Sequence, residues 1–454
     1  MTAGSPFRPE TLSPRVMSND SPRTTSPNRP PPNRPPPNRS PPNRRSTDDG
    51  SRSRPARGDA ADRGGHDRDV AVVGGGICGL TTALALERHG RSPTVYEAAS
   101  EYEPVGAGIL LQTNAMLVLD RLGIADAVRE AGTRLDEGGL RSLDGEFMVR
   151  FDLDALERRE FGYGFVAVHR ADLQRILLDE LDADVRTGMD CVAVDGSDPP
   201  VARFDDGTEI RPDVLVGADG IHSTVRDAVA PETSPRALDG VAYRALVSLD
   251  VPEAYRTRGF EVWGDGAYTG GSPVDANRFY WFATAPDRLT DDRADPGAVS
   301  AALRSHLAGY PEPIPAILAA LDPADLVVTD LADLPPLDTW SRDRVVLAGD
   351  AAHAMLPFAG QGAAQAIEDG VMLADALATA ADHERAFEAY EADRKPRADR
   401  LRDASHRLGR LGTIQSALGC RLRNLVIDAV PDAAIRRVRR RQAAGTSLPN
   451  GHNP

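Results

Sequence analysis

The spacing of hydrophobic and polar positions changes several times along the chain, and each change predicts a different element. Val70–Val73 is a short apolar run that ends in three glycines. Apolar residues then recur at helical spacing from Leu80 to His89, and Pro93–Glu97 has the pattern of a second strand. Together these residues predict a strand, a turn, a helix and a strand within positions 69–97.

Two later apolar runs are of the same type as the first. Val214–Val216 and Val345–Ala348 are short, continuous and followed directly by glycine, which is typical of strands buried in a parallel sheet. Before the first of them, Val201–Phe204 and Thr208–Ile210 flank an Asp-Gly pair and predict a β-hairpin.

Between about residues 237 and 336 the pattern becomes alternating. Val241–Val247, Phe260–Trp263 and Arg278–Ala283 are the expected strands of an antiparallel sheet. From Gln361 to about Arg441 the pattern is mainly helical. We therefore expect an α/β fold, in which a ligand-binding domain is interrupted by a sheet domain and followed by C-terminal helices.

Composition separates the first 66 residues from the remainder. They are rich in Pro, Arg, Asn and Ser, and we expect a disordered tail, which is either an interaction segment or a dispensable extension. The whole chain has a net charge of −15, although the tail is basic, so the rest is strongly acidic. An acidic surface repels phosphate backbones, and no nucleic acid is expected as a partner.

Cysteine spacing and hydropathy limit the location and the type of site. The three cysteines lie far apart and form neither a disulfide framework nor a metal motif, so we expect no metal. The N-terminus lacks an apolar secretion signal, and no run of about 18 apolar residues occurs. We expect a cytoplasmic protein without membrane association, and the pattern leaves its oligomeric state open.

The first chemical motif is the G-x-G-x-x-G sequence formed by Gly74, Gly76 and Gly79 between the first strand and the first helix. Gly74 permits a tight turn, Gly76 allows a pyrophosphate to approach, and Gly79 lets the helix pack on the strand. Glu97, at the end of the second strand, is placed to accept hydrogen bonds from ribose hydroxyls. The unit predicts a bound FAD or NAD.

A second motif, near position 350, favours FAD. Asp350 follows Gly349 at the end of a buried strand, where it can accept hydrogen bonds from a polyol such as a ribityl chain. A helix that begins near Gln361, between Gly360 and Gly362, would direct its positive end towards the ring of a reduced flavin.

The segment from Asp213 to Arg226 lies between these motifs. Its glycines on either side of Asp219 allow backbone to pass close to a ligand, and Ser223 can cap the helix that continues through Arg226.

These three segments together resemble the flavoprotein aromatic hydroxylases, the family of para-hydroxybenzoate and salicylate hydroxylases, over roughly residues 69–430. The resemblance implies that Asp219 lies near FAD, that the loop containing Gly108 lies near the isoalloxazine ring, and that Arg170 reaches the cofactor. It implies a Rossmann-like FAD/NAD(P)-binding domain at 67–137, 166–236 and 337–385, with an inserted antiparallel substrate domain at 138–165 and 237–336. Residues 386–445 would form C-terminal helices.

The resemblance also implies a reaction. NADH or NADPH would reduce FAD, and O2 would then form a C4a-hydroperoxide that hydroxylates or epoxidises a small organic substrate, which we expect to be aromatic. Pro357 would border the reacting flavin face. His353 and Tyr243 are further catalytic candidates, although the family equivalent of His353 is chiefly structural. The candidate substrate contacts of the sheet domain are Tyr243, Arg244, Trp263, Tyr268, Tyr280 and Trp281.

Two alternatives remain open at this point. One is an FAD-dependent reductase of prenyl double bonds, which has a similar fold. The other is a non-catalytic flavin-binding or membrane-associated protein, in which Arg421, Arg423 and residues 436–441 would contact anionic lipid. The alternative explanation for these arginines is a solvated helix that offsets an acidic body.

Overall fold

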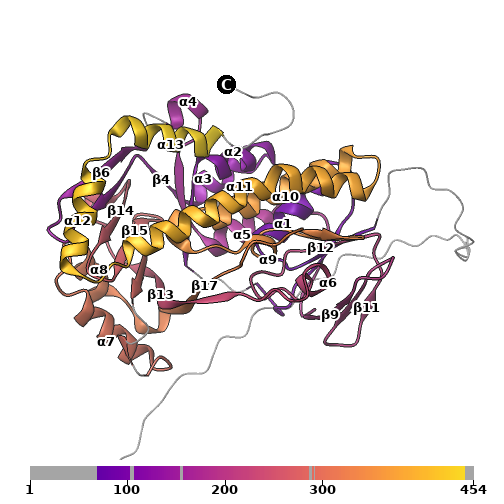
Figure 1. The fold of residues 1–454 in the computed structure, drawn as a ribbon, viewed down its shortest axis with the longest axis horizontal. Coiled ribbons are helices and arrows are strands. Elements are labelled where there is room, and N and C mark those ends of the chain that lie inside the picture. Colours follow the sequence, from indigo (N-terminus) through magenta and orange to yellow (C-terminus); the bar gives the residue numbers. More distant parts are fainter. Residues whose placement is uncertain (1–68, 103–106, 154–156, 286–288, 291, 445–454) are drawn as a thin grey trace, which may run out of the picture. The chain divides into compact units, whose positions relative to one another are not determined.

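Six strands form a mostly parallel sheet in the computed structural model. Their order is β18 (Ser341–Arg342), β19 (Val345–Leu347), β12 (Val214–Gly217), β1 (Val70–Val73), β2 (Thr94–Tyr96) and β8 (Asp184–Arg186). One of them, β12, is labelled in Figure 1. All neighbours pair in parallel except β18, which is antiparallel to β19. The structure describes residues 69–102, 107–153, 157–285, 289–290 and 292–444, all within one compact unit, Asp62–Pro454.

Helices pack beside this sheet and against one another, and together they help to bury the apolar strands. They are α1 (Ile77–Arg88), α2 (Thr113–Arg121), α3 (Ala125–Ala131), α5 (Arg170–Asp179), α6 (Arg226–Val229), α9 (Asp350–His353), α10 (Gly362–Thr379) and α11 (His383–Gly412). Helices α1 and α10 pack closely, because a Cβ atom at Gly370 would lie only 2.8 Å from the backbone nitrogen of Thr82. The main hydrophobic core lies between this helix layer and the sheet.

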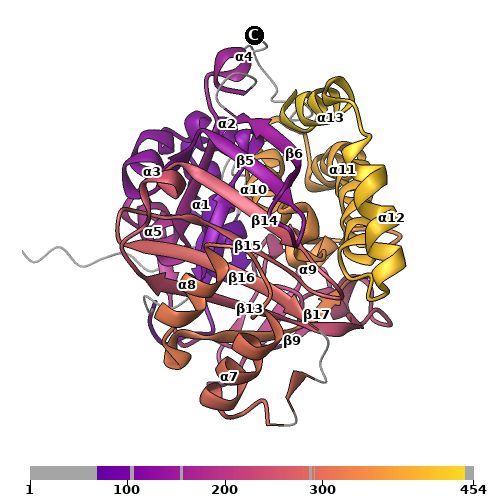
Figure 2. The same cartoon turned by 90° about the vertical axis from the view of Figure 1, so that its left-hand side faces the viewer.

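Seven strands form the second large sheet. Their order is β17 (Val327–Asp333), β13 (Arg236–Ser248), β16 (Arg278–Ala285), β15 (Tyr268–Pro273), β14 (Arg258–Trp263), β5 (Glu137–Arg141) and β6 (Phe147–Asp152). All neighbours are antiparallel except β14 and β5. One face packs in a second core with α7 (Pro296–His306) and α8 (Ile314–Ala320), as Figure 2 shows.

Two three-stranded sheets complete the described part of the chain. One has the order β3 (Gly108–Leu111), β7 (Phe165–His169), β4 (Thr133–Leu135), and the other has β11 (Glu209–Ile210), β10 (Val201–Phe204), β9 (Cys191–Asp195). A short helix, α4, spans Arg159–Phe161. Helices α12 (Ala417–Asp428) and α13 (Asp432–Ala444) follow α11 along one side of the fold (Figure 2).

The predicted strands and the predicted α/β class are confirmed. Both segments assigned to the substrate domain supply strands to the seven-stranded sheet, although the domain boundaries themselves remain predictions. The predicted tail, residues 1–66, lies outside the described residues, as does part of the loop before Gly108. Within the described ranges, none of the helices is both long and apolar enough to cross a lipid bilayer.

Candidate active site

Three loops meet at the carboxyl ends of neighbouring parallel strands. The backbone nitrogen of Ala218, after β12, donates to Val73 of β1 at 2.8 Å, and that of Ala348, after β19, donates to Gly217 at 2.9 Å. Gly74 has a φ of +100°, and a Cβ atom there would lie 2.4 Å from the carbonyl oxygen of Ala218. The turn after β1 therefore requires glycine, and ligands of open α/β sheets bind at this edge.

Two more glycines let the loops approach each other. A Cβ atom at Gly79 would lie 1.8 Å from the carbonyl oxygen of Gly74, so a larger residue would push α1 away from its strand. Gly349 has a φ of +61°, and a Cβ atom there would lie 2.9 Å from Sγ of Cys78. The loop before α9 thus lies against the start of α1, although the two are some 270 positions apart in the sequence.

A cavity of about 690 Å³ extends from these loops to the seven-stranded sheet. Gly76, at the start of α1, and Gly220, in the loop after β12, both line it, so the segments converge on one space. A Cβ atom at Gly76 would meet no other residue, which means that this position faces the cavity. Of the other predicted site residues, those that line the cavity are Arg170, Asp350, Pro357, Gly360, Gln361 and Gly362.

The remaining predicted cofactor residues support the loops from behind. Glu97 accepts hydrogen bonds from the backbone nitrogens of Gly75 at 2.7 Å and Ala99 at 2.9 Å. Asp219 accepts from the backbone nitrogens of Thr224 and Val225, at 2.8 and 3.1 Å. These carboxylates fix the turns around the cavity. They do not line it.

Gly108 joins the two large parts of the site. A Cβ atom there would lie 2.5 Å from Cβ of Tyr280, so β3 can pack against β16 only because this position lacks a side chain. Ser223 Oγ accepts from the backbone nitrogen of Arg226 at 2.9 Å. The N-cap of α6 is Val225 and has no side-chain cap, so Ser223 supports the turn before the helix instead of capping it.

Strand alternation decides which face of the seven-stranded sheet each candidate side chain lies on. Arg244, Trp263, Tyr268 and Tyr280 line the cavity. Tyr243 and Trp281 belong instead to the core on the opposite face of the sheet. Neither side chain lines the cavity, so Tyr243 is not placed to act as a catalytic residue. Adjacent residues of a strand point to opposite faces, which is why Tyr243 and Arg244 separate.

Asp350 is exposed to the cavity yet enclosed by protein. Burial raises the pKa of its carboxyl group, against the opposing influence of His353 and Arg170. Because it lines the cavity, the Asp350 side chain is placed to form hydrogen bonds with the hydroxyl groups of a ligand.

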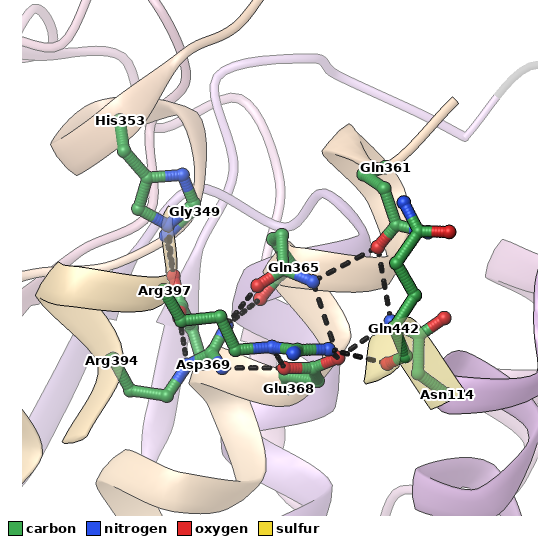
Figure 3. Close-up of polar contacts among 10 residues, drawn as sticks. All are labelled: Asn114, Gly349, His353, Gln361, Gln365, Glu368, Asp369, Arg394, Arg397 and Gln442. Atoms are coloured by element: carbon green, nitrogen blue, oxygen red, sulfur yellow. Dashed lines mark hydrogen bonds and ion pairs between the residues drawn. The ribbon is translucent and has the colours of Figure 1, made fainter. Parts of the chain in front are cut away.

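A buried polar network supports the loop that contains Gly349 and Asp350 (Figure 3). Arg394 of α11 donates to Glu368 at 2.5 Å and to Asp369 at 2.7 Å, and Arg397 donates to Glu368 at 2.8 Å. Asp369 in turn accepts from the backbone nitrogen of Gly349 at 2.8 Å. The network therefore fixes the residue that precedes Asp350.

His353 belongs to this network. Its Nε2 lies 2.5 Å from Asp369 Oδ2, its ring is 1% exposed, and it does not line the cavity. The imidazole and the Arg394 guanidinium hold the pKa of Asp369 at about 2, below its ordinary value, despite the opposing effect of burial. His353 is thus placed to hold the loop of Gly349 and Asp350 in position, and its ring does not reach a ligand in the cavity.

The network also reaches the loop before α10. Asn114 donates to Gln361 at 3.1 Å and to Glu368 at 2.6 Å. The side-chain nitrogen Nε2 of Gln361 is buried and has no hydrogen-bond partner among the described residues. The first turns of α1 and α10 contain no acidic residue, and no side chain caps either helix. Their amides are available to negatively charged groups.

These observations fit a flavin dinucleotide. The glycine at 76 leaves space for a pyrophosphate, Asp350 offers an acceptor for hydroxyl groups, and the start of α10 offers donors to a ring. A model of the family described as FAD binding domain matches residues 67–405. The chain belongs to this FAD-binding family. This match and the monooxygenase and hydroxylase relatives together confirm the resemblance to the flavoprotein hydroxylases.

Relatives extend the assignment to the type of enzyme. The aurachin C monooxygenase/isomerase of Stigmatella aurantiaca is 36% identical over 358 residues, which cover 78% of this chain and 92% of that protein. The 2-heptyl-3-hydroxy-4(1H)-quinolone synthase of Pseudomonas aeruginosa is 34% identical over 383 residues, covering 83% and 98%. A crystal structure of Klebsiella pneumoniae HpxO with FAD and uric acid has a TM-score of 0.75 at 28% identity and covers 83% and 97%.

The protein is an FAD-dependent monooxygenase. The comparisons favour this activity over the alternative of a prenyl double-bond reductase. Within the part of the chain that the structure describes, no cluster of three or more potential metal ligands occurs.

Sequence reasoning did not predict that three residues lie at or beside the cavity. Glu261 of β14 lines the cavity, but a single acidic residue in an alternating strand gives no signal. Arg439 belongs to the arginine run 436–441, whose pattern indicates either a lipid contact or a solvated helix, yet it pairs with the buried Glu157 and lines the cavity. Arg423 is 4% exposed and donates to the carbonyl oxygens of Trp263 and Gly264. The lipid-contact hypothesis is therefore wrong for Arg423 and Arg439.

Proposed function

We propose that the protein uses NADH or NADPH and O2 to hydroxylate, or epoxidise, an aromatic substrate held between the bound flavin and the seven-stranded sheet. The observation that carries this proposal is one continuous cavity, lined at one end by Gly76 and Asp350 and at the other by side chains of β13, β14 and β16. Bound FAD would supply the redox chemistry and the activation of O2.

The residues around the cavity have distinct proposed roles. The turn formed by Gly74, Gly76 and Gly79, with Glu97 behind it, would hold the adenosine and pyrophosphate part. Asp350, with Gly349, would hold the ribityl chain. Further contacts to the cofactor would come from Gly108, Arg170, Asp219, Gly360, Gln361 and Gly362.

Helix α10 would stabilise negative charge on the ring. Its N-terminal amides and the Gln361 side chain are the donors at that end of the cavity, and a partly buried helix terminus contributes about 1–2 kcal/mol to a nearby anion. Pro357 lines the cavity beside them and would border the reacting face. Since the chain has one G-x-G-x-x-G motif, the nicotinamide would bind without a domain of its own.

The cavity wall supports an aromatic substrate. The substrate side is lined by Leu135, Phe151, Phe165, Tyr268, Tyr280 and Phe282. Such a wall excludes water and stacks against a planar ring. The relatives that match are named for quinolone, urate and aminohydroxybenzoate chemistry, and each of these compounds contains a planar ring.

The direct test is oxidation of NAD(P)H by the purified FAD-loaded enzyme, with oxygen uptake followed in parallel. A panel of a 2-alkyl-4(1H)-quinolone, urate and an aminohydroxybenzoate should contain a compound that accelerates NAD(P)H oxidation and gains one oxygen atom. Asp350→Ala should lose FAD on gel filtration while its far-UV circular dichroism is kept. Asp428→Ala, an exposed aspartate on α12, is the matched control and should keep FAD. Full retention of FAD by Asp350→Ala would contradict the assigned role.

A further inference from the structure

Five residues form one row across the seven-stranded sheet. Arg244 of β13 pairs with Phe282, Phe282 with Gly270, Gly270 with Glu261, and Glu261 with Leu140 of β5. Apart from Gly270, all of them line the cavity. Because neighbouring strands lie about 4.8 Å apart, Arg244 and Glu261 are about 14 Å from each other. The row therefore carries a cation near one end and a carboxylate near the other.

The two charges serve different parts of the cavity. Burial raises the pKa of Asp350, and Arg244 lies close enough to oppose this shift. Arg244 also opposes the raised pKa values of Tyr268 and Tyr280, so it lies between the proposed flavin end and the aromatic wall. Among the described residues, no cation influences the pKa of Glu261. Glu261 thus stands in the distal, apolar part of the cavity without a compensating charge.

The protein holds the Glu261 side chain in place. Trp263 donates from Nε1 to Glu261 Oε2 at 3.2 Å. Arg423 of α12 fixes Trp263 in turn, because its guanidinium lies 5.6 Å from the centre of the indole ring and donates to the Trp263 carbonyl oxygen at 3.2 Å. Only one of the two carboxylate oxygens is engaged by these residues, and the side chain borders the cavity.

A carboxylate in this position is costly for folding. Burial raises the pKa of Glu261 to about 7, and the hydrogen bond from Trp263 offsets only part of this effect. A buried charge without a partner destabilises a protein, and an apolar residue would pack against Leu135 and Phe282 at lower cost. Strongly perturbed carboxyl groups that border a cleft are typical of functional sites.

We propose that Glu261 is the substrate-recognition residue, accepting a hydrogen bond from an N–H or O–H group of a neutral, largely apolar aromatic substrate. This inference rests on the proposed function of the cavity. A donor group on the substrate would engage the second carboxylate oxygen while the rest of the molecule contacts the apolar wall. A substrate that carries a carboxylate at this end would be repelled, so benzoate-like anions are disfavoured there.

The binding experiment uses matched pairs of neutral probes with the FAD-loaded enzyme. The pairs are 2-heptyl-4(1H)-quinolone and 4-heptylphenol, each against its N-methyl or O-methyl derivative, measured by isothermal titration calorimetry from pH 6 to pH 8.5. At pH 8 at least one unmethylated probe should bind at least tenfold more tightly than its methylated partner. The preference should fade towards pH 6, as Glu261 becomes protonated and is a weaker acceptor.

Two variants separate recognition from a merely structural role. Glu261→Gln should bind the unmethylated probe about tenfold more weakly at pH 8 and lose the pH dependence. Trp263→Phe removes the hydrogen bond that lowers the pKa of Glu261, so the pH at which binding strengthens should move upward. Both variants should keep the FAD content of the wild type, which shows that the fold is intact.

The outcomes distinguish this inference from the proposed function. If no probe pair shows a preference, or if Glu261→Gln keeps both the affinity and the pH dependence, recognition by Glu261 is overturned. Binding is measured without turnover, so that result stands whether or not the enzyme oxidises NAD(P)H. An enzyme that shows the binding preference but never consumes O2 would contradict the proposed function and leave the recognition by Glu261 supported.

Discussion

Arg394 neutralises two carboxylates that are fully enclosed by protein. Its side chain is 2% exposed, and Glu368 and Asp369 are not exposed at all. Replacing it with methionine would fill a similar volume and would remove one buried cationic partner from each of the two acids. We expect Arg394→Met to lower the free energy of unfolding by about 3–5 kcal/mol in urea titrations.

The exposed arginine on the same helix provides the control for this variant. Arg385 pairs with Glu388 at 2.8 Å, but its side chain is 72% exposed. Arg385→Met should change the free energy of unfolding by less than about 1 kcal/mol, because water screens the pair. Equal losses in the two variants would mean that the buried network contributes no more than a surface ion pair.

The shifted pKa of Asp369 gives this network a pH signature. In the folded protein the carboxyl has a pKa of about 2, below its ordinary value of 3.8. A lowered pKa in the folded state stabilises the protein above the ordinary pKa, and this contribution is lost as the pH falls from about 4 to 2.

The pKa of Glu261 is shifted in the opposite direction to that of Asp369, so its effect on stability has the opposite pH dependence. Its pKa rises from 4.5 to about 7 on folding, so the folded state binds a proton more tightly and loses stability as the pH rises between these values. Glu261→Gln mimics the protonated form. We expect it to raise the free energy of unfolding of the enzyme by about 3 kcal/mol at pH 8 and to have almost no effect at pH 4. A gain of the same size at both pH values would contradict this account.

At the scale of elements, α12 has two unlike faces. Its inner face carries the buried Cys420 and Arg423, while Leu418 and Leu425 on the outer face are 78% and 66% exposed. Leu418→Gln with Leu425→Gln should leave the free energy of unfolding within about 0.5 kcal/mol of the wild type. The same double variant should elute earlier from a hydrophobic-interaction column, because two of the exposed apolar side chains of α12 are gone.

Substitution on the inner face of α12 should change the free energy of unfolding more than substitution on the outer face. Arg423→Met removes hydrogen bonds to the carbonyl oxygens of Trp263, Gly264 and Leu411, and should cost about 2 kcal/mol in the same urea titration. If the Leu418→Gln, Leu425→Gln double variant lost several kcal/mol of unfolding free energy, the outer face of α12 would have to be covered in solution by another molecule.

The elements themselves were largely predictable from the sequence, because their signals are local. Val70–Val73 and Val201–Phe204 are strands with the predicted bounds, since apolar runs and turn residues act over a few positions. The side chains around the substrate part of the cavity were less predictable. Glu261 and Arg439 reach it only because distant elements pack together, and no local pattern marks that packing. Strand alternation alone does show that Tyr243 and Arg244 cannot both face the cavity.

At the scale of the whole molecule, FAD should act as a structural partner of three distant segments. Binding to the folded state alone stabilises it in proportion to the logarithm of ligand concentration, by about 4 kcal/mol at a thousandfold excess over Kd. The melting temperature of the FAD-free protein should therefore rise steadily with added FAD. NAD⁺ at equal concentration should raise it far less. A melting temperature that does not respond to FAD would contradict the convergence of the three loops on one ligand.

The position of β19 has a consequence for synthesis. A chain that has grown only to residue 340 already contains β1 and β12, but one edge of β12 lacks its partner until Val345–Leu347 follows. Loop 349–350 and the arginines of α11 come later still. During translation a chain that ends near residue 340 therefore exposes an unpaired strand and has no complete pocket. The nascent polypeptide can thus capture its prosthetic group only when most of it has left the ribosome.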